Sequence, residues 1–293
     1  MPWIKLEFAI QPDRADAVSD ALVEAGASAV TLIDGGDQPV LEPAPGEIRL
    51  WDDTRVIGLF EADTDIEATL SLIGALLQGP LPTHRVEALE DKDWVRAWMD
   101  DYKPMAFGDR LWIVPWHSEP PEPNAINLRL DPGLAFGTGT HPTTALCLSW
   151  LDGQDCTGQN VLDFGCGSGI LGIAALLLGA QRVDAVDIDP QALQATLENA
   201  QRNGVADRIH TYLPDAAPRV QADRVLANIL AKPLLELAPL LASHCRPGGH
   251  IVLAGLLDNQ AHEVSARYSE WFIMDPPESL DGWTRLSGQR HPS

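Results

Sequence analysis

The chain has 293 residues, of which 45% are hydrophobic, and a formal net charge of −22 from 42 acidic and 20 basic residues. This length allows one large domain or two smaller ones, each able to bury a core. So acidic a composition argues against direct binding of exposed nucleic-acid backbone, which requires clustered lysine and arginine, and it favours a basic protein partner or reflects the demands of solubility.

Residues 1–90 are predicted to form a small separate domain. Its expected elements are a strand, helix, strand, strand, helix and strand, at residues 3–9, 13–25, 29–33, 47–60, 66–77 and 85–89. The fourth of these is predicted as a hairpin of 47–51 and 55–60 around Asp52-Asp53-Thr54. This order is typical of a ferredoxin-like α+β sandwich. The segment holds seventeen acidic and five basic residues, a balance of −12, so more than half of the net charge lies here.

Residues 91–102 are predicted to form a helical linker to a second domain at 103–293. Trp94 and Trp98 are four residues apart and therefore share one face of this helix. We expect the pair to pack between the domains, with direct substrate contact as the alternative. Residues 111–115 are then predicted as a strand, followed by a proline-rich loop at 118–124.

Residues 131–144 read D-P-G-L-A-F-G-T-G-T-H-P-T-T. Three glycines and four threonines without apolar periodicity are not typical of a core segment. Such a stretch makes backbone turns and offers hydroxyl groups, so it is predicted to be a loop that covers a ligand. Thr143 and Thr144 begin the next helix, where a hydroxyl either caps the helix or contacts the ligand.

The stretch 161–189 has the densest pattern in the chain. A short apolar strand ends in Asp163, a turn with Gly165, Gly167 and Gly169 follows, and a helix and a second strand lead to Asp187. Strand, glycine turn, helix, strand and acid in this order predict the first part of a nucleotide-binding α/β sheet. The final acid is positioned to accept hydrogen bonds from both hydroxyls of a ribose.

Two cofactors fit this pattern. The glycines at 167, 169 and 172 match G-x-G-x-x-G, and Asp187 follows at the distance that a dinucleotide site requires. Asp163 directly before Gly165 and Gly167 fits an S-adenosylmethionine site better. That cofactor has no pyrophosphate, so the turn would approach its methionine and ribose portions instead.

The remainder continues as alternating helices and strands. They are predicted at 190–203, 209–213, 224–228, 233–244, 250–254 and 260–268, with closing strands at 271–274 and 283–287. Asn228 ends one of these strands and opens Asn228-Ile229-Leu230, while Asp215 is expected near an adenine amino group. Trp271 and Trp283 are expected in the core.

The four cysteines have neither C-x-x-C spacing nor histidine-rich neighbours, so no metal site and no disulfide framework are predicted. The N-terminus lacks the apolar core and basic flank of a signal peptide, and no apolar run is long enough for a membrane span. A soluble cytoplasmic protein without a membrane partner is expected.

Taken together, D-F-G-C-G-S-G, D-I-D-P, N-I-L and D-P-G-L-A-F-G-T-G-T-H-P-T-T resemble the bacterial methyltransferases of large-subunit ribosomal protein eleven. The glycine turn is shared by all class I methyltransferases, whereas F-G-T-G-T-H-P-T-T is specific to this family. The resemblance covers residues 90–293 by motif and the N-terminal segment by strand order. It implies a Rossmann-like, seven-stranded class I methyltransferase domain after a ferredoxin-like domain that recognises the substrate.

By this resemblance, Thr144, Gly165, Asp187 and Asn228 would hold S-adenosylmethionine, with Asp163 and Gly167 in the same turn. Phe136 and Gly137 would close over it. The family methylates the N-terminal α-amine and lysine side chains of the basic ribosomal protein, repeatedly.

Methyl transfer from a sulfonium to an amine needs positioning and a neutral amine more than acid–base catalysis. Asn228 is the predicted catalytic residue, which orients the amine through its side chain or the backbone of Asn228-Ile229. Ile229-Leu230 departs from the Asn-Pro-Pro-Tyr motif of amine-directed methyltransferases, so the missing aromatic residue would be supplied by Phe136 or a linker tryptophan. His141 is expected to be structural, with proton relay as the alternative.

Three other functions remain open on the sequence alone. One is an amine methyltransferase that acts on another protein or on nucleic-acid bases. The second is an NAD-dependent dehydrogenase, although no hydride-transfer residue set is found. The third is a cofactor-sensing module that has lost catalysis, against which the intact Asp187 and Asn228 argue.

Overall fold

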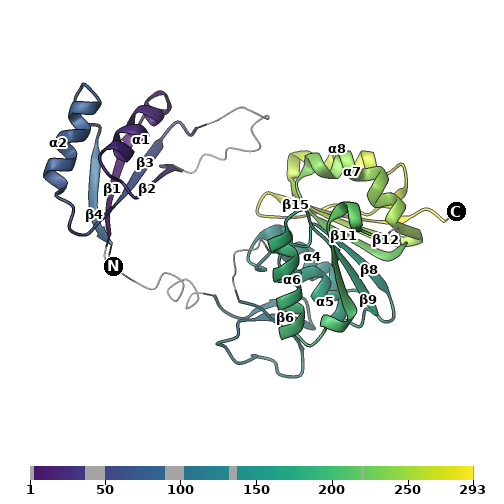
Figure 1. The fold of residues 1–293 in the computed structure, drawn as a ribbon. Coiled ribbons are helices and arrows are strands. Elements are labelled where there is room, and N and C mark those ends of the chain that lie inside the picture. Colours follow the sequence, from purple (N-terminus) through teal and green to yellow (C-terminus); the bar gives the residue numbers. More distant parts are fainter. Residues whose placement is uncertain (1–2, 37–49, 90–101, 132–136, 219–220, 293) are drawn as a thin grey trace. The chain divides into compact units, whose positions relative to one another are not determined.

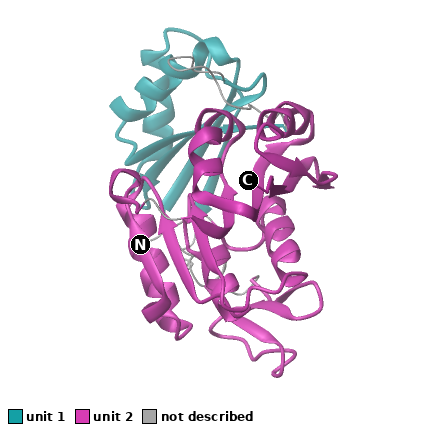
Figure 2. Cartoon of the chain, turned by 90° about the vertical axis from the view of Figure 1, so that its right-hand side faces the viewer, with its two compact units in different colours: residues 1–97 teal, residues 98–293 magenta. Residues whose placement is uncertain are grey.

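A computed structural model of the chain describes all residues except 1–2, 37–49, 90–101, 132–136, 219–220 and 293. The chain divides into two compact units, Met1–Ala97 and Trp98–Ser293 (Figure 2). The helix predicted for the linker lies outside the described residues apart from its last position, Tyr102. No helix in the described part of the chain is both long and apolar enough to cross a membrane.

The first unit is an antiparallel sheet with two helices. Its elements are β1 (Trp3–Ile10), α1 (Ala15–Glu24), β2 (Ala29–Asp34), β3 (Thr54–Glu61), α2 (Ile66–Leu76) and β4 (His84–Leu89). The strands pair in the order β2-β3-β1-β4, which follows the ferredoxin-like element order that the sequence predicts (Figure 1).

Alternation along β1 explains how this unit forms its core. Leu6, Phe8 and Ile10 are buried and pack with Val18 and Leu22 of α1, because every second side chain of a strand points to the same face. Burial of these apolar side chains between sheet and helices supplies the main stabilising term.

The hairpin predicted within this unit is wrong. Leu50 and Trp51 lie outside any strand, and 47–49 lie outside the described residues. Both edges of β3 are already paired, one with β2 and the other with β1, so β3 has no edge left for a hairpin partner. The apolar residues before Asp52 resemble a strand in the sequence, but β3 has no free edge with which they could pair.

The second unit contains an eight-stranded sheet with helices on both faces (Figure 1). Its elements are β8 (Asn160–Phe164), α5 (Ile170–Leu177), β9 (Arg182–Val186), α6 (Pro190–Arg202), β10 (Ile209–Tyr212), β11 (Ala222–Asn228), α7 (Ala231–His244), β12 (Cys245–Leu257), α8 (Ala261–Tyr268), β13 (Phe272–Met274), β14 (Glu278–Leu280) and β15 (Trp283–Arg290). The sheet order is β10-β9-β8-β11-β12-β15-β13, and β14 pairs with β15. The seven predicted strands thus form the main path, and β14 is an addition.

Adjacent residues of β8 face opposite sides of the sheet and pack against different helices. Val161 packs in a cluster with residues of α4 (Pro142–Asp152) and α5, while Leu162 packs in a cluster with residues of α7 and α8. Both faces of the parallel strands are therefore covered, as an α/β sheet requires. A separate three-stranded sheet of β5 (Met105–Phe107), β6 (Leu111–Val114) and β7 (Ile126–Arg129) also belongs to this unit, and only its middle strand was predicted.

The strand order fixes where a ligand site forms. From β8, the chain proceeds to β9 on one side, while β11 pairs with β8 on the other side. The direction of winding reverses at this point, and the connections after neighbouring strands diverge at their carboxyl ends. The glycine turn after β8, Asp187 after β9 and Asn228 at the end of β11 all lie at this edge.

Candidate active site

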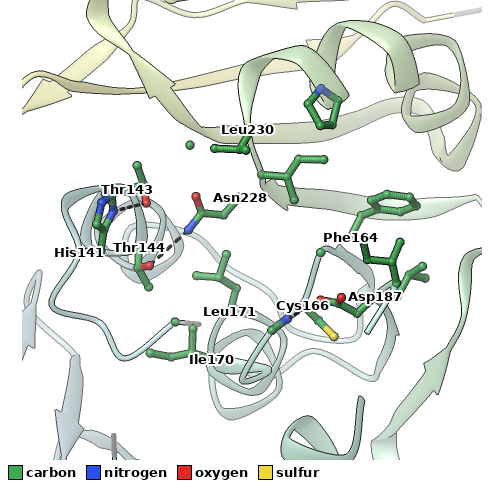
Figure 3. A pocket seen from close by; sticks show the side chains of 18 of the residues that line it. His141, Thr143, Thr144, Phe164, Cys166, Ile170, Leu171, Asp187, Asn228 and Leu230 are labelled. Carbon is green, nitrogen blue, oxygen red and sulfur yellow. Dashed lines mark hydrogen bonds between the residues drawn. The ribbon is translucent and has the colours of Figure 1, made fainter. Parts of the chain in front are cut away.

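A cavity of about 520 Å³ lies where these strands end. Of the sequence-predicted site residues that the structure describes, six line it: Gly137, Thr144, Gly165, Gly167, Asp187 and Asn228. Figure 3 shows Asn228 and Thr144 on one side of the cavity and Asp187 with Cys166 on the other. Phe136, the remaining loop residue predicted to cover the ligand, lies outside the described residues.

The glycine turn requires residues without side chains. Gly165 and Gly167 have φ angles of 77° and 54°, in the left-handed region that favours glycine. A Cβ atom on Gly165 would lie 2.2 Å from Cγ2 of Ile229. The turn therefore approaches the end of β11 more closely than any other residue type allows.

Asp187 uses both carboxylate oxygens within the turn. Oδ2 accepts a hydrogen bond from the backbone N–H of Gly167 at 2.9 Å, and Oδ1 accepts one from Asp189 at 3.0 Å. These bonds fix the carboxylate at the cavity wall with lone pairs remaining for a ligand. The next residue, Ile188, is 82% exposed and also lines the cavity, so an apolar surface lies directly beside the acid.

Asp163 differs from the other predicted residues because it does not line the cavity. Its side chain is 1% exposed, and Oδ2 accepts a hydrogen bond from the N–H of Gly172 at 2.9 Å. Burial raises the pKa of Asp163 to about 7, with the hydrogen bond from Gly172 opposing this shift and the charge of Asp187 adding to it. Asp163 thus fixes α5 against β8 and acts on the site through the fold.

Thr144 and Asn228 are hydrogen-bonded to each other at one side of the cavity. The side-chain N–H of Asn228 (Nδ2) donates to Oγ1 of Thr144 at 3.3 Å. Because the amide N–H group is directed to Thr144, Oδ1 of Asn228 is the oxygen that remains for a ligand. The cap of this helix is His141, and the hydroxyl of Thr144 instead orients the asparagine.

His141 has a structural role at the start of α4. Its Nδ1 accepts a hydrogen bond from the N–H of Thr143 at 3.3 Å and lies 2.7 Å from the hydroxyl oxygen of the same residue (Figure 3). Burial lowers the pKa of the imidazole, which favours its neutral form. The sequence-based expectation of a structural role agrees with this helix cap.

Trp283 was expected in the core, and the structure corrects this. It is half-buried at the start of β15, lines the cavity, and its ring lies 4.7 Å from the ring of His141 in an edge-on arrangement. Trp271 is also half-buried, and it packs against the edge of the core cluster instead of lying within it. A sequence signal for Trp283 was present, since it follows the turn residues Asp281 and Gly282, and turns at strand ends position functional side chains.

Gly255 was also missed. It lies in β12, lines the cavity and has φ of 87°. A Cβ atom there would lie 2.2 Å from the carbonyl oxygen of Ile229. Ile229 is therefore held between two glycines, with Gly165 against its side chain and Gly255 against its backbone. A single glycine within an apolar strand does not identify a cavity residue from the sequence, because its neighbour in space must be known first.

Among the residues that the structure describes, no group of three or more histidine, cysteine, aspartate or glutamate side chains is arranged to hold an ion. The four cysteines are buried free thiols. Burial raises the pKa of Cys166, beside the glycine turn, well above its usual range, so this thiol stays protonated and is a poor nucleophile.

Comparisons with known proteins match the whole chain. The family model described as "Ribosomal protein L11 methyltransferase (PrmA)" matches residues 2–291. A relative of that name from Marinobacter nauticus is 58% identical over 296 residues, covering 99% of each chain. One from Azotobacter vinelandii is 57% identical over 292 residues, covering 99% of this chain and 100% of the relative.

A solved structure supports the same assignment. The crystal structure of the ribosomal protein L11 methylase from Lactobacillus delbrueckii subsp. bulgaricus has 33% sequence identity and a TM-score of 0.58. It covers 65% of this chain and 100% of its own. The family that the sequence motifs resemble is thereby confirmed. The chain belongs to the ribosomal protein L11 methyltransferase family.

Proposed function

We propose that this protein transfers methyl groups from S-adenosylmethionine to amines of ribosomal protein L11. The acceptors are its N-terminal α-amine and lysine side chains. The observation that carries this proposal is the cavity, whose wall combines Asp187, the glycine turn and Asn228. Two relatives whose alignments cover 99% of this chain are named ribosomal protein L11 methyltransferase.

The residues present fit S-adenosylmethionine. Asp187 has lone pairs for ribose hydroxyls, and the exposed Ile188 offers an apolar surface for a purine. The glycine turn leaves room for the methionine portion, as Gly165 and Gly167 have no side chains. A volume of about 520 Å³ is in the range of small-molecule sites, which is about 300–1,000 Å³. When bound, this cofactor supplies an electrophilic methyl group on a sulfonium centre.

Asn228 orients the acceptor amine in this proposal. Thr144 fixes the amide by accepting from Nδ2, so Oδ1 is available to accept an N–H of the amine and direct its lone pair. A free lysine has a pKa of about 10.4 and must lose its proton before it reacts. The apolar wall of Ile229, Leu230 and Trp283 disfavours the charged form and lowers that pKa.

The acidic N-terminal part is proposed to recognise the substrate protein. Residues 1–90 carry a balance of −12, and ribosomal proteins are basic, so opposite charges accelerate their encounter. In this proposal 91–102 link the docking domain to the catalytic domain at 103–293. A docked substrate then presents several amines to one cavity. Because the proposed substrate is a ribosomal protein, the enzyme is proposed to act in the cytoplasm.

Mass spectrometry tests the proposal directly. Purified L11 is incubated with S-adenosylmethionine and either the wild-type protein or Asn228→Ala. We expect methyl increments on the N-terminus and lysines with the wild type, and a rate reduced about 100-fold or more with the variant. Binding of S-adenosylhomocysteine, measured by calorimetry, serves as the control for an intact site.

Each outcome separates the alternatives. Cofactor binding without increments on L11 moves the search to another protein or to nucleic-acid bases as acceptor. Competition by NAD with S-adenosylhomocysteine for the cavity, together with no methyl transfer, contradicts the proposal. Cofactor binding without transfer to any acceptor indicates a sensing module instead of an enzyme.

A further inference from the structure

Part of the cavity wall comes from the segment 137–141. Gly137 and His141 both line the cavity, and the segment leads into α4 and Thr144. The shape of this wall depends on what holds the peptide groups of Gly137 and Thr138.

Two hydroxyl groups hold two consecutive carbonyl groups of this wall. Oγ of Ser168, in the glycine turn, donates to the carbonyl of Gly137 at 2.5 Å. The phenol of Tyr102 donates to the carbonyl of Thr138. The wall is thus tied to the glycine turn on one side and to the buried cluster of Tyr102 on the other.

A third contact, at Gly139, also attaches this segment to the rest of the domain. Gly139 has φ of 91°, and a Cβ atom built on it would lie 3.5 Å from Met105 and Phe107 and 3.6 Å from Ile113. The backbone of Gly139 therefore rests directly on the small sheet of β5 and β6. Tyr102 precedes this sheet in the chain and is 6% exposed in the same buried cluster.

The phenol of Tyr102 is suited to this role. Burial raises its pKa far above the ordinary value, and the negative charge of Asp131 adds to the shift, so the hydroxyl keeps its proton. A hydroxyl that keeps its proton remains a donor, which is what a backbone carbonyl requires. The ring itself is packed, so the donor has one fixed position.

We propose that Tyr102 is a positioning residue for the part of the cavity wall formed by Gly137. Tyr102 does not line the cavity, so it acts through the Thr138 carbonyl. Its hydrogen bond fixes the Thr138–Gly139 peptide group and so keeps the preceding carbonyl, that of Gly137, against Ser168 before the ligand arrives. This spares the ligand the cost of ordering this wall. The inference rests on the proposed function, because the ligand is S-adenosylmethionine or its product.

Tyr102→Phe is the test, with Tyr268→Phe as the matched control. Tyr268 is also buried, its phenol also donates to a backbone carbonyl, that of Leu234 at 2.9 Å, and it does not line the cavity. Each variant loses one buried hydrogen bond and keeps its ring. Calorimetry measures the Kd of S-adenosylhomocysteine, steady-state kinetics give KM and kcat, and thermal unfolding gives Tm.

We expect both variants to lower Tm. Tyr102→Phe should raise the Kd of S-adenosylhomocysteine and the KM of S-adenosylmethionine about tenfold, with kcat at saturating cofactor within about twofold of the wild type. Tyr268→Phe should leave Kd and KM unchanged within about twofold. Adding Ser168→Ala to Tyr102→Phe should raise Kd by less than the product of the single effects, because the two side chains hold adjacent peptide groups of one segment.

The inference is wrong if Tyr102→Phe lowers Tm but leaves Kd and KM at wild-type values. Fully independent effects of Tyr102→Phe and Ser168→Ala on Kd would also overturn it. A wild-type protein that does not bind S-adenosylhomocysteine refutes the proposed function instead, so the two failures are distinguishable.

Discussion

Asp163 and Asp187 illustrate how two carboxylates of one motif acquire different roles. Asp187 lies at the cavity and accepts hydrogen bonds from the backbone of Gly167 in the turn and of Asp189, whereas Asp163 is buried behind the turn. A Cβ atom on Gly172 would lie 3.1 Å from Oδ2 of Asp163 and 2.9 Å from Val183. The absence of a side chain at residue 172 therefore allows α5 to approach close enough for its N–H to reach Asp163.

The burial of Asp163 predicts a pH-dependent stability. Its pKa is raised from 3.8 to about 7, so the folded state holds the proton more tightly than the unfolded chain between these values. The contribution of Asp163 to the free energy of unfolding therefore falls as pH rises from about 4 to about 7, by at most about 1.4 kcal/mol per pH unit, and is level above that range.

Asp163→Asn should remove this contribution, because the amide resembles the protonated carboxyl and keeps an acceptor for Gly172. Urea unfolding of the wild type and the variant at pH 5 and pH 7.5 provides the measurement. We expect the stability of the variant relative to the wild type to increase between these two pH values. An equal pH dependence in both proteins would contradict the buried, proton-binding state of Asp163.

At the scale of elements, α6 supports the cofactor turn from behind. Thr196 donates to the carbonyl of Gly167 at 3.0 Å, and Asn199 donates to that of Ser168 at 2.9 Å. Asn203 exchanges two hydrogen bonds with the backbone of Arg129 in β7, both at 2.8 Å. Spacings of three and four residues bring these side chains to one face of the helix.

Asn199→Ala should weaken cofactor binding without any change inside the cavity. The carbonyl of Ser168 loses a donor, at a cost of about 1–2 kcal/mol, and we expect the Kd of S-adenosylhomocysteine to rise about three- to tenfold. Gln194→Ala is the control, because Gln194 lies on the same helix and its side chain donates to Glu198 in an exposed pair. Calorimetry measures the Kd of S-adenosylhomocysteine for both variants. Equal Kd values for Asn199→Ala and Gln194→Ala would refute the supporting role of α6.

Elements with long periodic patterns were predictable from the sequence. The strand at 182–186 has the predicted bounds, and the helix at 190–202 ends one residue before the predicted end, because proline at its start and glycine after its end mark its limits. β5, β7 and β14 were missed, since strands of three or four residues carry almost no periodicity. Their pairing depends on distant partners that local sequence does not reveal.

The same reason explains why some cavity residues were predicted from the sequence and others were missed. Gly165, Gly167, Asp187 and Asn228 were predictable because they stand at strand ends within recognisable motifs. Trp283 and Gly255 reach the cavity only because β15 and β12 lie side by side in the sheet, with Leu256 opposite Thr284. Tyr102 was named only as the end of the linker, and its contact with Thr138 spans 36 residues.

At the scale of the whole molecule, charge is distributed unevenly along the chain. Residues 1–90 carry −12 of the net −22. Four acids lie at exposed positions along the start and outer side of α1, at helical spacing: Asp13, Asp16, Asp20 and Glu24. Like charges at this spacing destabilise a helix slightly, so their presence has a cost in stability.

Neutralising these acids should slow encounter with a basic acceptor. We expect the variant Asp13→Asn, Asp16→Asn, Asp20→Asn, Glu24→Gln to lose several-fold in kcat/KM for L11 at low ionic strength, and to approach the wild type at high salt. The KM of S-adenosylmethionine should not change. Neutralisation of four exposed acids of the second unit serves as control, namely Glu198, Asp207, Glu236 and Glu263. Equal losses in both variants would show that only total charge matters.

The position of Ile229 between two glycines also limits the order in which mutations can accumulate. At residue 165 the obstacle is one methyl group of Ile229, so a lineage that first shortens residue 229 to alanine gains space for a residue that tolerates a left-handed backbone, such as asparagine. At residue 255 the obstacle is the backbone of Ile229, which no substitution removes. Directed evolution of acceptor specificity should therefore vary residue 229 first, residue 165 only afterwards, and leave Gly255 unchanged.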